Sequence, residues 1–144
     1  QVFAIEHHRE RFACIQANCE RFGVVNNVTA INARAPAALA VIPVANKIFI
    51  GGSDGELPSL LNLCWQQLPA GGVLVASAVT ENTKMILQHF YANLQDSAER
   101  QTLQVAVSRG GELAGQLLYR PNLPVSLFKF NKPFNKIAQV EGQL

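Results

Sequence analysis

Three stretches of the chain carry residue types that could bind a nucleotide-like cofactor or an anionic substrate. The first is VFAIE, an apolar run that ends in the acid Glu6. An acid at the carboxyl tip of a parallel strand can accept hydrogen bonds from ribose hydroxyls, as it does in dinucleotide and adenosyl sites. The alternative is that Glu6 is an exposed acid that caps a helix beginning near His8.

The second stretch, FIGGSDGE, places glycines at the tip of an expected strand. It matches neither the GxxxxGK(S/T) phosphate loop nor the GxGxxG dinucleotide loop, because the offsets of Gly51, Gly52 and Gly55 are wrong. Gly51 and Gly52 would still let a ligand approach the backbone closely, and the N–H groups of the following helix could receive a carboxylate. The alternative is a tight turn in which Ser53 caps the helix, with Glu56 at capping-box spacing.

The third stretch is VSRGGELAGQLLYRPNLPV. It carries Arg109 at the expected end of a strand, where a guanidinium group could pair with a substrate carboxylate. The alternative is an ordinary surface arginine. The neighbouring Gly110 and Gly111 predict the turn of a β hairpin.

Other kinds of site are not indicated by the sequence. The three cysteines and three histidines show no spacing typical of metal ligands. Cys19 and Cys64 fall on the apolar faces of expected helices, which is typical of buried thiols in a reducing cytoplasm. A net charge of +2 without a densely basic stretch argues against nucleic acid as a partner, and no apolar run is long enough to span a membrane.

The elements that would position these residues alternate between helix and strand. At 144 residues, 49% of them apolar, the chain is long enough for one domain with a buried core. The alternation predicts a parallel α/β sheet with helices on both faces and an antiparallel hairpin at one edge. Gly23 is expected to end the first helix and Thr80 to cap the last. The expected strands cover residues 2–6, 28–31, 46–50, 73–78, 103–108, 115–120 and 125–130.

Together these stretches resemble one family, the decarboxylating precorrin-6Y methyltransferases of cobalamin biosynthesis. The likeness runs from about Val2 to Phe128. It is carried by VFAIEHHRERFACIQANCERFGVVNNVTAINARAPAAL, KIFIGGSDGELPSLLNLCWQQLPAGGVLVASAVTENT and VAVSRGGELAGQLLYRPNLPV. The patterns FIGGS.GEL and VSRG…NPV are fairly specific to that family, whereas the strand acid and PAGG are general to class I methyltransferases.

The resemblance implies a Rossmann-like class I methyltransferase sheet with an antiparallel hairpin at its end. It also implies an enzyme that transfers a methyl group from S-adenosylmethionine to C15 of a precorrin and removes the carboxyl group of the C12 acetate chain. A homo-oligomer assembled partly through the terminal strands is implied too, and a second methylase domain could lie upstream. The methyltransferase domain would cover residues 1–130, followed by a loose tail at 131–144.

The resemblance transfers part of a cofactor site to this chain. Glu6 matches the acid that binds the cofactor ribose, and Gly51 matches a glycine beside the methyl-transfer site. The family usually has Gly-Asp-Ala-Pro where this chain has ARAP at residues 33–36. Backbone contacts to adenine from Arg34 and Ala35 would survive that change, but a side-chain contact from an acid would not.

The substrate side is assigned more loosely by the resemblance. Gly52 matches the second glycine beside the methyl-transfer site, and Ser53 and Arg109 are expected to face the precorrin. The electron-rich macrocycle would attack the sulfonium methyl group, so the site would mainly supply alignment and exclusion of water. No catalytic general base is assigned.

One part of the family pattern is absent from this sequence. The family's first strand and Gly-rich cofactor loop would precede VFAIE. We therefore expect these 144 residues alone to bind the cofactor poorly or not at all. Two alternatives stay open: an NAD(P)-binding oxidoreductase fragment, which would share the strand acid, and a non-catalytic scaffold with the methyltransferase fold, which the presence of Arg34 in place of an acid favours.

Overall fold

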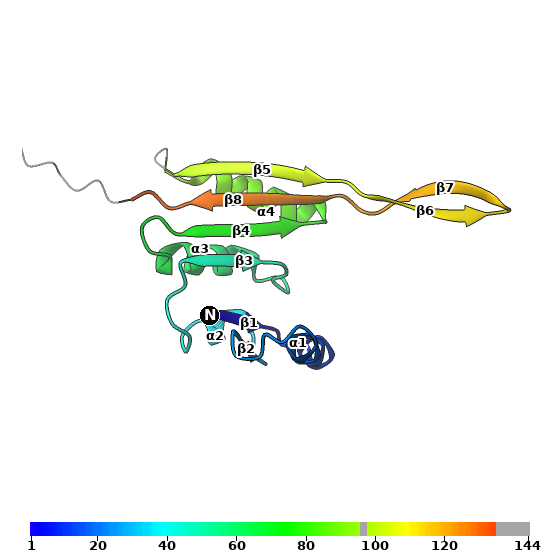
Figure 1. Cartoon of the computed structure of the whole chain (residues 1–144). Helices are drawn as coiled ribbons and strands as arrows, with labels where there is room; N and C mark the ends of the chain where they lie inside the picture. The colour runs from blue at the N-terminus through cyan, green and yellow to red at the C-terminus, as the bar shows by residue number, and fades with distance from the viewer. Residues whose placement is uncertain (96–97, 135–144) are drawn as a thin grey trace, which may run out of the picture. The chain divides into compact units, whose positions relative to one another are not determined.

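The computed structural model describes residues 1–95 and 98–134 of the chain (Figure 1). The chain divides into two compact units, Gln1–Val44 and a second unit that begins at Ala45, and each is described by itself. Residues 135–144 of the expected tail lie outside the described part. Among the described helices, none combines the length and the apolar character needed to cross a membrane.

The first unit is built on two short strands that pair in parallel. β1 (Val2–Ile5) and β2 (Val28–Ile31) are aligned along their whole length. α1 (Arg9–Arg21) connects the two strands, and α2 (Ala35–Ala38) follows β2. The alternation of strand and helix predicted for this part of the chain is confirmed. α2 tolerates Pro36 in its first turn, where a backbone N–H is not needed.

Gly23 ends α1 as the sequence predicts. Its φ of +67° is in the left-handed region that glycine adopts without steric cost. The Gly23 N–H donates to the carbonyl of Glu20 at 3.1 Å, and the Val24 N–H donates to the carbonyl of Cys19 at 2.9 Å. These two bonds form a Schellman motif, which satisfies carbonyl groups that the end of a helix leaves without partners.

The second unit contains a four-stranded mixed sheet and two helices. These elements are β3 (Lys47–Ile50), α3 (Leu57–Gln67), β4 (Val73–Ala78), α4 (Glu81–Asn93), β5 (Glu99–Val105) and β8 (Val125–Asn131). The strands lie in the order β3-β4-β8-β5. β3 and β4 are parallel, whereas β8 is antiparallel to both of its neighbours. Thr80 caps α4 as predicted, because its Oγ1 accepts the Thr83 N–H at 3.3 Å.

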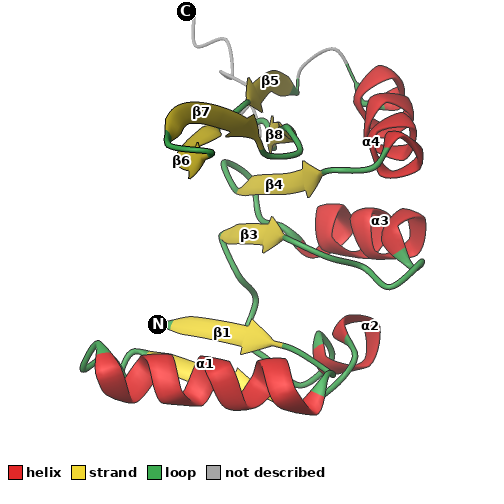
Figure 2. Cartoon of the chain, turned by 90° about the vertical axis from the view of Figure 1, so that its right-hand side faces the viewer, coloured by secondary structure: helices red, strands yellow, loops and turns green. Residues whose placement is uncertain are grey.

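The core of the second unit lies between this sheet and its two helices. α3 and α4 lie on the same side of the sheet (Figure 2). Along β4 and β8 every second residue is buried, which is the period expected of a sheet that packs on one face. Phe90 of α4 meets Phe130 of β8 edge to face, with ring centroids 5.1 Å apart. The largest fully buried side chains are Phe130, Leu61, Leu68, Leu74, Leu87 and Cys64.

A separate two-stranded hairpin interrupts the sheet between β5 and β8. It consists of β6 (Ser108–Leu113) and β7 (Gln116–Pro121), and it extends beyond the four-stranded sheet (Figure 1). The sequence predicted one strand over 103–108, where the structure has the end of β5 and the start of β6. The antiparallel pairing at one edge of the sheet is confirmed, but β5 and β8 form it rather than the hairpin.

The hairpin turn is not where the sequence predicts it. Gly110 and Gly111 lie inside β6, so the prediction of a Gly-Gly turn is wrong. The two turn residues are Ala114 and Gly115, with φ of +50° and +74°. Two central residues with positive φ are typical of the type I′ turn, whose twist suits a two-residue hairpin loop. Ala114 hides this turn in the sequence, because alanine rarely adopts positive φ.

The last described residues are held against the second unit. The expected tail begins at residue 131, but Asn131 is still part of β8. The Lys132 Nζ donates to the carbonyl groups of Trp65, Gln66 and Leu68 at 2.8, 3.2 and 2.6 Å. A cation at this position satisfies the carboxyl end of α3 and interacts favourably with its dipole.

Candidate functional site

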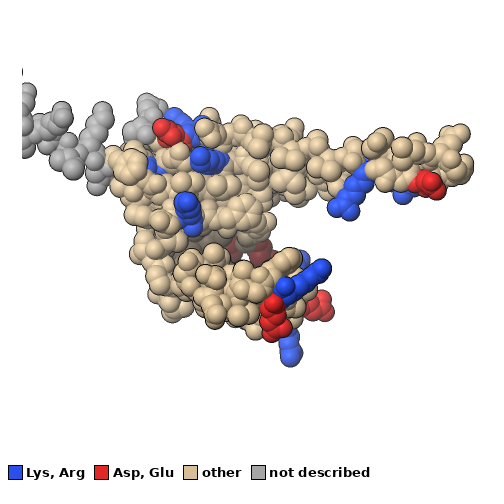
Figure 3. Space-filling model, in the orientation of Figure 1, with Lys and Arg blue, Asp and Glu red and all other residues tan. Residues whose placement is uncertain are grey.

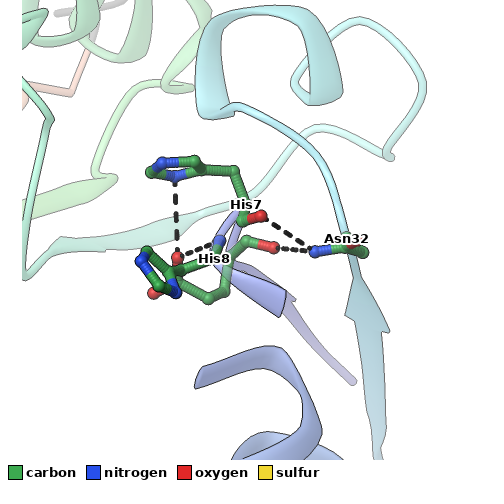
Figure 4. Close-up of polar contacts among 4 residues, drawn as sticks. His7, His8 and Asn32 are labelled. Carbon is green, nitrogen blue, oxygen red and sulfur yellow. Dashed lines mark hydrogen bonds and ion pairs between the residues drawn. The ribbon is translucent and has the colours of Figure 1, made fainter. Parts of the chain in front are cut away.

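Glu6 lies directly after β1, at the carboxyl end of the parallel pair. Its Oε1 accepts a hydrogen bond from the backbone N–H of His8 at 2.8 Å, and His7 Nδ1 lies 3.6 Å from the same oxygen (Figure 4). The Glu6 side chain is 20% exposed. Its Oε2 accepts no hydrogen bond within the described part of the chain. One oxygen of the Glu6 carboxylate therefore holds the backbone before α1 in place, and the other oxygen can accept hydrogen bonds from a ligand.

Asn32 fixes the backbone around Glu6, a role that was not predicted from the sequence. Its Nδ2 donates to the carbonyl oxygens of Glu6 at 2.9 Å and His7 at 3.2 Å (Figure 4). The Glu6 N–H also donates to the carbonyl of Ile31 at 3.1 Å. An asparagine placed directly after a strand is the signal that could have indicated such a bond, because its short side chain readily reaches nearby backbone.

Arg34 and Ala35 lie at the same edge of the first unit as Glu6. β1 and β2 run in parallel, so their carboxyl ends meet there. Arg34 is the N-cap residue of α2, with φ −77° and ψ 138°, and its carbonyl accepts the Ala38 N–H at 3.0 Å. Ala35 is the first helical residue, so its N–H has no acceptor inside the helix. The structure thus brings the first three expected cofactor residues to one strand edge.

The loop after β3 differs from the expected capping box. α3 begins at Leu57, and its N-cap residue is Glu56 rather than Ser53, so that prediction is wrong. Ser59 Oγ donates to Glu56 Oε2 at 3.1 Å, and Ser53 contributes only its carbonyl, which accepts the Glu56 N–H at 2.8 Å. Ser53 and Ser59 lie three residues before and three residues after Glu56, so both have the spacing of a capping pair. Only Ser59, inside the helix, binds the Glu56 side chain.

The two glycines before this loop are not required by the turn. Asp54 and Gly55 make the left-handed turn, with φ of +47° and +86°, whereas Gly51 and Gly52 do not have positive φ. A Cβ atom built on Gly52 would meet nothing within 4 Å, and one on Gly51 would lie 3.1 Å from Phe49 Cε1. The fold therefore accepts a side chain at residue 52. A ligand that lies close to the backbone would explain a glycine at this position, because a side chain would occupy the space of the ligand.

Arg109 lies apart from the loop that holds the other expected substrate-side residues. It is the second residue of β6, and it is exposed. Gly52 and Ser53 follow β3, and among the described residues no hydrogen bond or ion pair links either of them to Arg109. In Figure 3 basic side chains project from one side of the hairpin, and an acidic side chain lies farther along the same side in that view. Any contact of Arg109 with a substrate would therefore be made from the hairpin and not from the loop after β3.

The cysteines, histidines and acidic residues of the described chain do not indicate a metal site or a reactive thiol. Within residues 1–95 and 98–134 no group of three or more histidine, cysteine or acidic side chains gathers to hold a metal ion. Cys64 is buried as predicted, and that burial raises the pKa of its thiol to about 11. Cys19 is half-buried and Cys14 is exposed.

A hollow of about 450 Å³ lies elsewhere on the second unit. Its walls come from α4, β5 and β8, and include Lys84, Tyr91, Thr102 and Ser126. None of the residues that the sequence analysis singled out lines it. The hollow therefore adds nothing to the candidate site.

Comparison with known proteins places the chain in a family. A family model described as "Precorrin methyltransferase domain" matches residues 1–132. The precorrin-6Y C(5,15)-methyltransferase (decarboxylating) of a Sinorhizobium species is 34% identical over 132 residues, which are 92% of this chain and 30% of that protein. The probable cobalt-precorrin-6B C(15)-methyltransferase (decarboxylating) of Pyrobaculum calidifontis is 30% identical over 111 residues, 76% of this chain and 55% of that protein.

A solved structure agrees with these sequence relatives. The crystal structure of precorrin-6y C5,15-methyltransferase from Geobacter metallireducens superposes with a TM-score of 0.80 and 26% identity, over 92% of this chain and 67% of that one. This likeness confirms the expected fold class, a mixed α/β sheet of the class I methyltransferase type. The chain spans less than two thirds of the length of the two curated relatives. Since the family model covers nearly all of its residues, the chain belongs to the precorrin methyltransferase domain family.

Proposed function

We propose that this chain carries out S-adenosylmethionine-dependent methylation of a precorrin at C15, coupled to loss of the C12 acetate carboxyl group, in cobalamin biosynthesis. The family membership and the names of the two relatives support the reaction class. The observation that carries the proposal is the carboxylate of Glu6. It lies at the carboxyl end of a parallel strand pair, held by the His8 N–H, with Oε2 available to a ligand.

On the cofactor side, Glu6 would accept hydrogen bonds from the ribose hydroxyls. The His8 N–H and the Asn32 amide hold the carboxylate and its backbone in place, which reduces the ordering cost of binding. Backbone groups of Arg34 and Ala35 would contact adenine. S-adenosylmethionine would supply the methyl group from its sulfonium centre, and Gly51 would leave room beside that group.

On the substrate side, Gly52 and Ser53 would lie against the precorrin, and Arg109 would bind one of its carboxylates. Gly52 fits this role because its backbone is open to a closely approaching ligand. The residues would align the macrocycle carbon with the methyl group and exclude water. We assign no general base to this chain.

Titration of S-adenosylhomocysteine, observed through the ligand's NMR signals so that weak binding is detected, tests the proposal. We expect binding to the chain and about a tenfold loss in Glu6→Gln, because hydrogen bonds to a charged group contribute about 1.5–3 kcal/mol. The matched control is Glu10→Gln, which removes an acid from the first turn of α1 and should bind as the original chain does.

Two outcomes would contradict the proposal. One is equal binding by Glu6→Gln and the original chain, which would remove Glu6 from the site. The other is binding of a nicotinamide dinucleotide without any binding of S-adenosylhomocysteine, which would revive the oxidoreductase alternative.

A further inference from the structure

Two arginines face each other across the hairpin. In the antiparallel pairing of β6 with β7, Arg109 lies directly opposite Arg120. Residues directly opposite share one face of the ribbon, with Cβ atoms about 4.5–5.5 Å apart. The hairpin is exposed, and both side chains are exposed on it. The sequence pattern points to Arg109 alone, because only the register of the strand pairing reveals Arg120 as its partner.

This pairing is unfavourable in the isolated chain. Like charges directly opposite each other destabilise a strand pair, and guanidinium groups stay charged at any physiological pH. The hairpin's one acid, Glu112, is paired with Leu117 and points to the opposite face. Among the described residues neither arginine has an ion pair or a hydrogen bond to its side chain. The face therefore carries two cations without a counter-charge.

The surface of the hairpin beside the two arginines is open. Gly111 is the next residue of β6 on their face, and a Cβ atom there would meet nothing within 4 Å. The neighbouring Gly110 is different, because it lies on the opposite face under Tyr119, whose ring atom would be 3.6 Å from its Cβ. On the arginine face Gly111 lies opposite Leu118, so the surface beside the two arginines is apolar and stays open above the glycine, where a flat ligand could lie.

We propose that Arg109 and Arg120 together bind a carboxylate of the tetrapyrrole substrate. This inference rests on the proposed function, and it adds Arg120 and the pairing itself to the site. Two guanidinium forks on one face can each donate paired N–H bonds to a carboxylate, which removes their mutual repulsion. A substrate that loses a carboxyl group in the reaction necessarily carries such groups.

A tetrapyrrole fits this face better than RNA does. RNA binding depends on several spread phosphate contacts and on aromatic rings that stack on bases. The arginine face offers two adjacent cations, and the one aromatic ring of the hairpin, Tyr119, lies on the other face. A compact pair of cations suits a single carboxylate on a flat molecule.

Binding of uroporphyrin, a flat tetrapyrrole with carboxylate chains on every pyrrole ring, tests the inference. Its fluorescence is followed as the full chain is added at fixed salt. We expect Arg120→Gln and Arg109→Gln each to raise the Kd about fivefold or more, since each breaks a charge-assisted pair. The double variant should lose little beyond either single change, because both arginines act on one group.

The controls distinguish specific binding by the pair of Arg109 and Arg120, here called the arginine clamp, from general attraction of the anionic ligand to basic residues. Arg9→Gln with Arg11→Gln removes two exposed charges from the region of α1, so its Kd should stay close to that of the original chain. Arg120→Lys keeps the charge without the fork and should recover only part of the affinity. An equal loss in the α1 double variant, unchanged binding in the hairpin variants, no binding by the original chain, or stronger displacement by an RNA oligonucleotide than by free carboxylates would each overturn the inference.

The proposed function fails separately. S-adenosylhomocysteine binding reports on Glu6, and the hairpin variants should leave it unchanged. Arginine-dependent uroporphyrin binding without any cofactor binding would refute methyl transfer and keep the clamp. If S-adenosylhomocysteine binds but uroporphyrin binding is unchanged in the Arg109 and Arg120 variants, the result would refute the role of these two arginines and leave the proposed function standing.

Discussion

Cys64 links the stability of the second unit to alkaline pH. Its thiol has an ordinary pKa of 9.0, and burial raises the pKa to about 11 in the folded chain. Between these values the unfolded chain releases the proton first, so the free energy of unfolding falls as the pH rises from about 9 to about 11. We expect this residue to account for a loss of about 1–3 kcal/mol. Urea unfolding across this pH range checks it.

The control for this prediction is Cys64→Ala. The substitution lowers stability at every pH because it removes buried volume, but it should flatten the slope above pH 9. A slope that is the same in both proteins would mean that other groups cause it.

Gly52 and Gly72 should respond to alanine in opposite ways. A Cβ atom on Gly72 would lie 2.5 Å from Leu68 Cγ and 2.8 Å from the Pro69 carbonyl oxygen, so Gly72→Ala should cost about 1–3 kcal/mol of stability. Gly52→Ala should change stability by less than about 0.5 kcal/mol, because the position is open. Its effect should instead be weaker binding of S-adenosylhomocysteine or uroporphyrin. Thermal melts and ligand titrations on both variants distinguish these outcomes.

Local patterns predict single residues well when one geometry satisfies them. Gly23 and Thr80 were correctly predicted, because a helix end needs positive φ and a helix start needs a side-chain acceptor. Ser53 was mispredicted because Glu56 has a serine on either side at the same spacing. Asn32 was missed because its bonds reach back to the end of another strand.

At the scale of elements, the carboxyl end of α3 depends on a residue far along the chain. Lys132 donates to three carbonyl groups there, and its Nζ lies 5.8 Å from the centroid of the Trp65 ring. Lys132→Met keeps most of the apolar stem but removes the charge and the donors. We expect it to lower the free energy of unfolding by about 1–2 kcal/mol. Chemical denaturation measures the difference.

The comparison for that prediction is Lys129→Met on β8. Lys129 is half-buried and is not among the residues that hold α3. We expect its substitution to change stability by less than half as much. Equal losses in the two variants would show that the capping bonds contribute nothing specific.

The sequence predicts most elements but not how the last strands are arranged. Apolar periods identify β3, β4 and β8 because each follows a regular pattern of burial. The order β4-β8-β5 depends on contacts between residues far apart in sequence, which no local pattern encodes. The exposed β6 and β7 carry no periodic burial, so their limits could not be read from hydrophobicity.

At the scale of the whole molecule, the two units differ in how much they bury. Among the described residues, nearly all of the buried apolar side chains belong to the second unit, and Ala38 is the one from the first unit. We therefore expect a fragment of residues 45–144 to unfold cooperatively by itself, and a fragment of residues 1–44 to lack a cooperative transition. Circular dichroism during heating measures both. A sharp transition in the short fragment, or none in the long one, would contradict this expectation.

The position of β8 also sets the order of events during synthesis. β8 leaves the ribosome after β3, β4 and β5, yet it is the strand that joins β4 to β5. Until Asn131 has been added, β5 has no strand beside it in the described sheet, and the nascent chain exposes that strand together with the unfilled place of Phe130. The second unit therefore closes late, after translation has passed the hairpin. In a nascent chain stalled before Val125, the apolar strand β4 would also lack its neighbour β8, and such an unpaired edge is a natural target for chaperones.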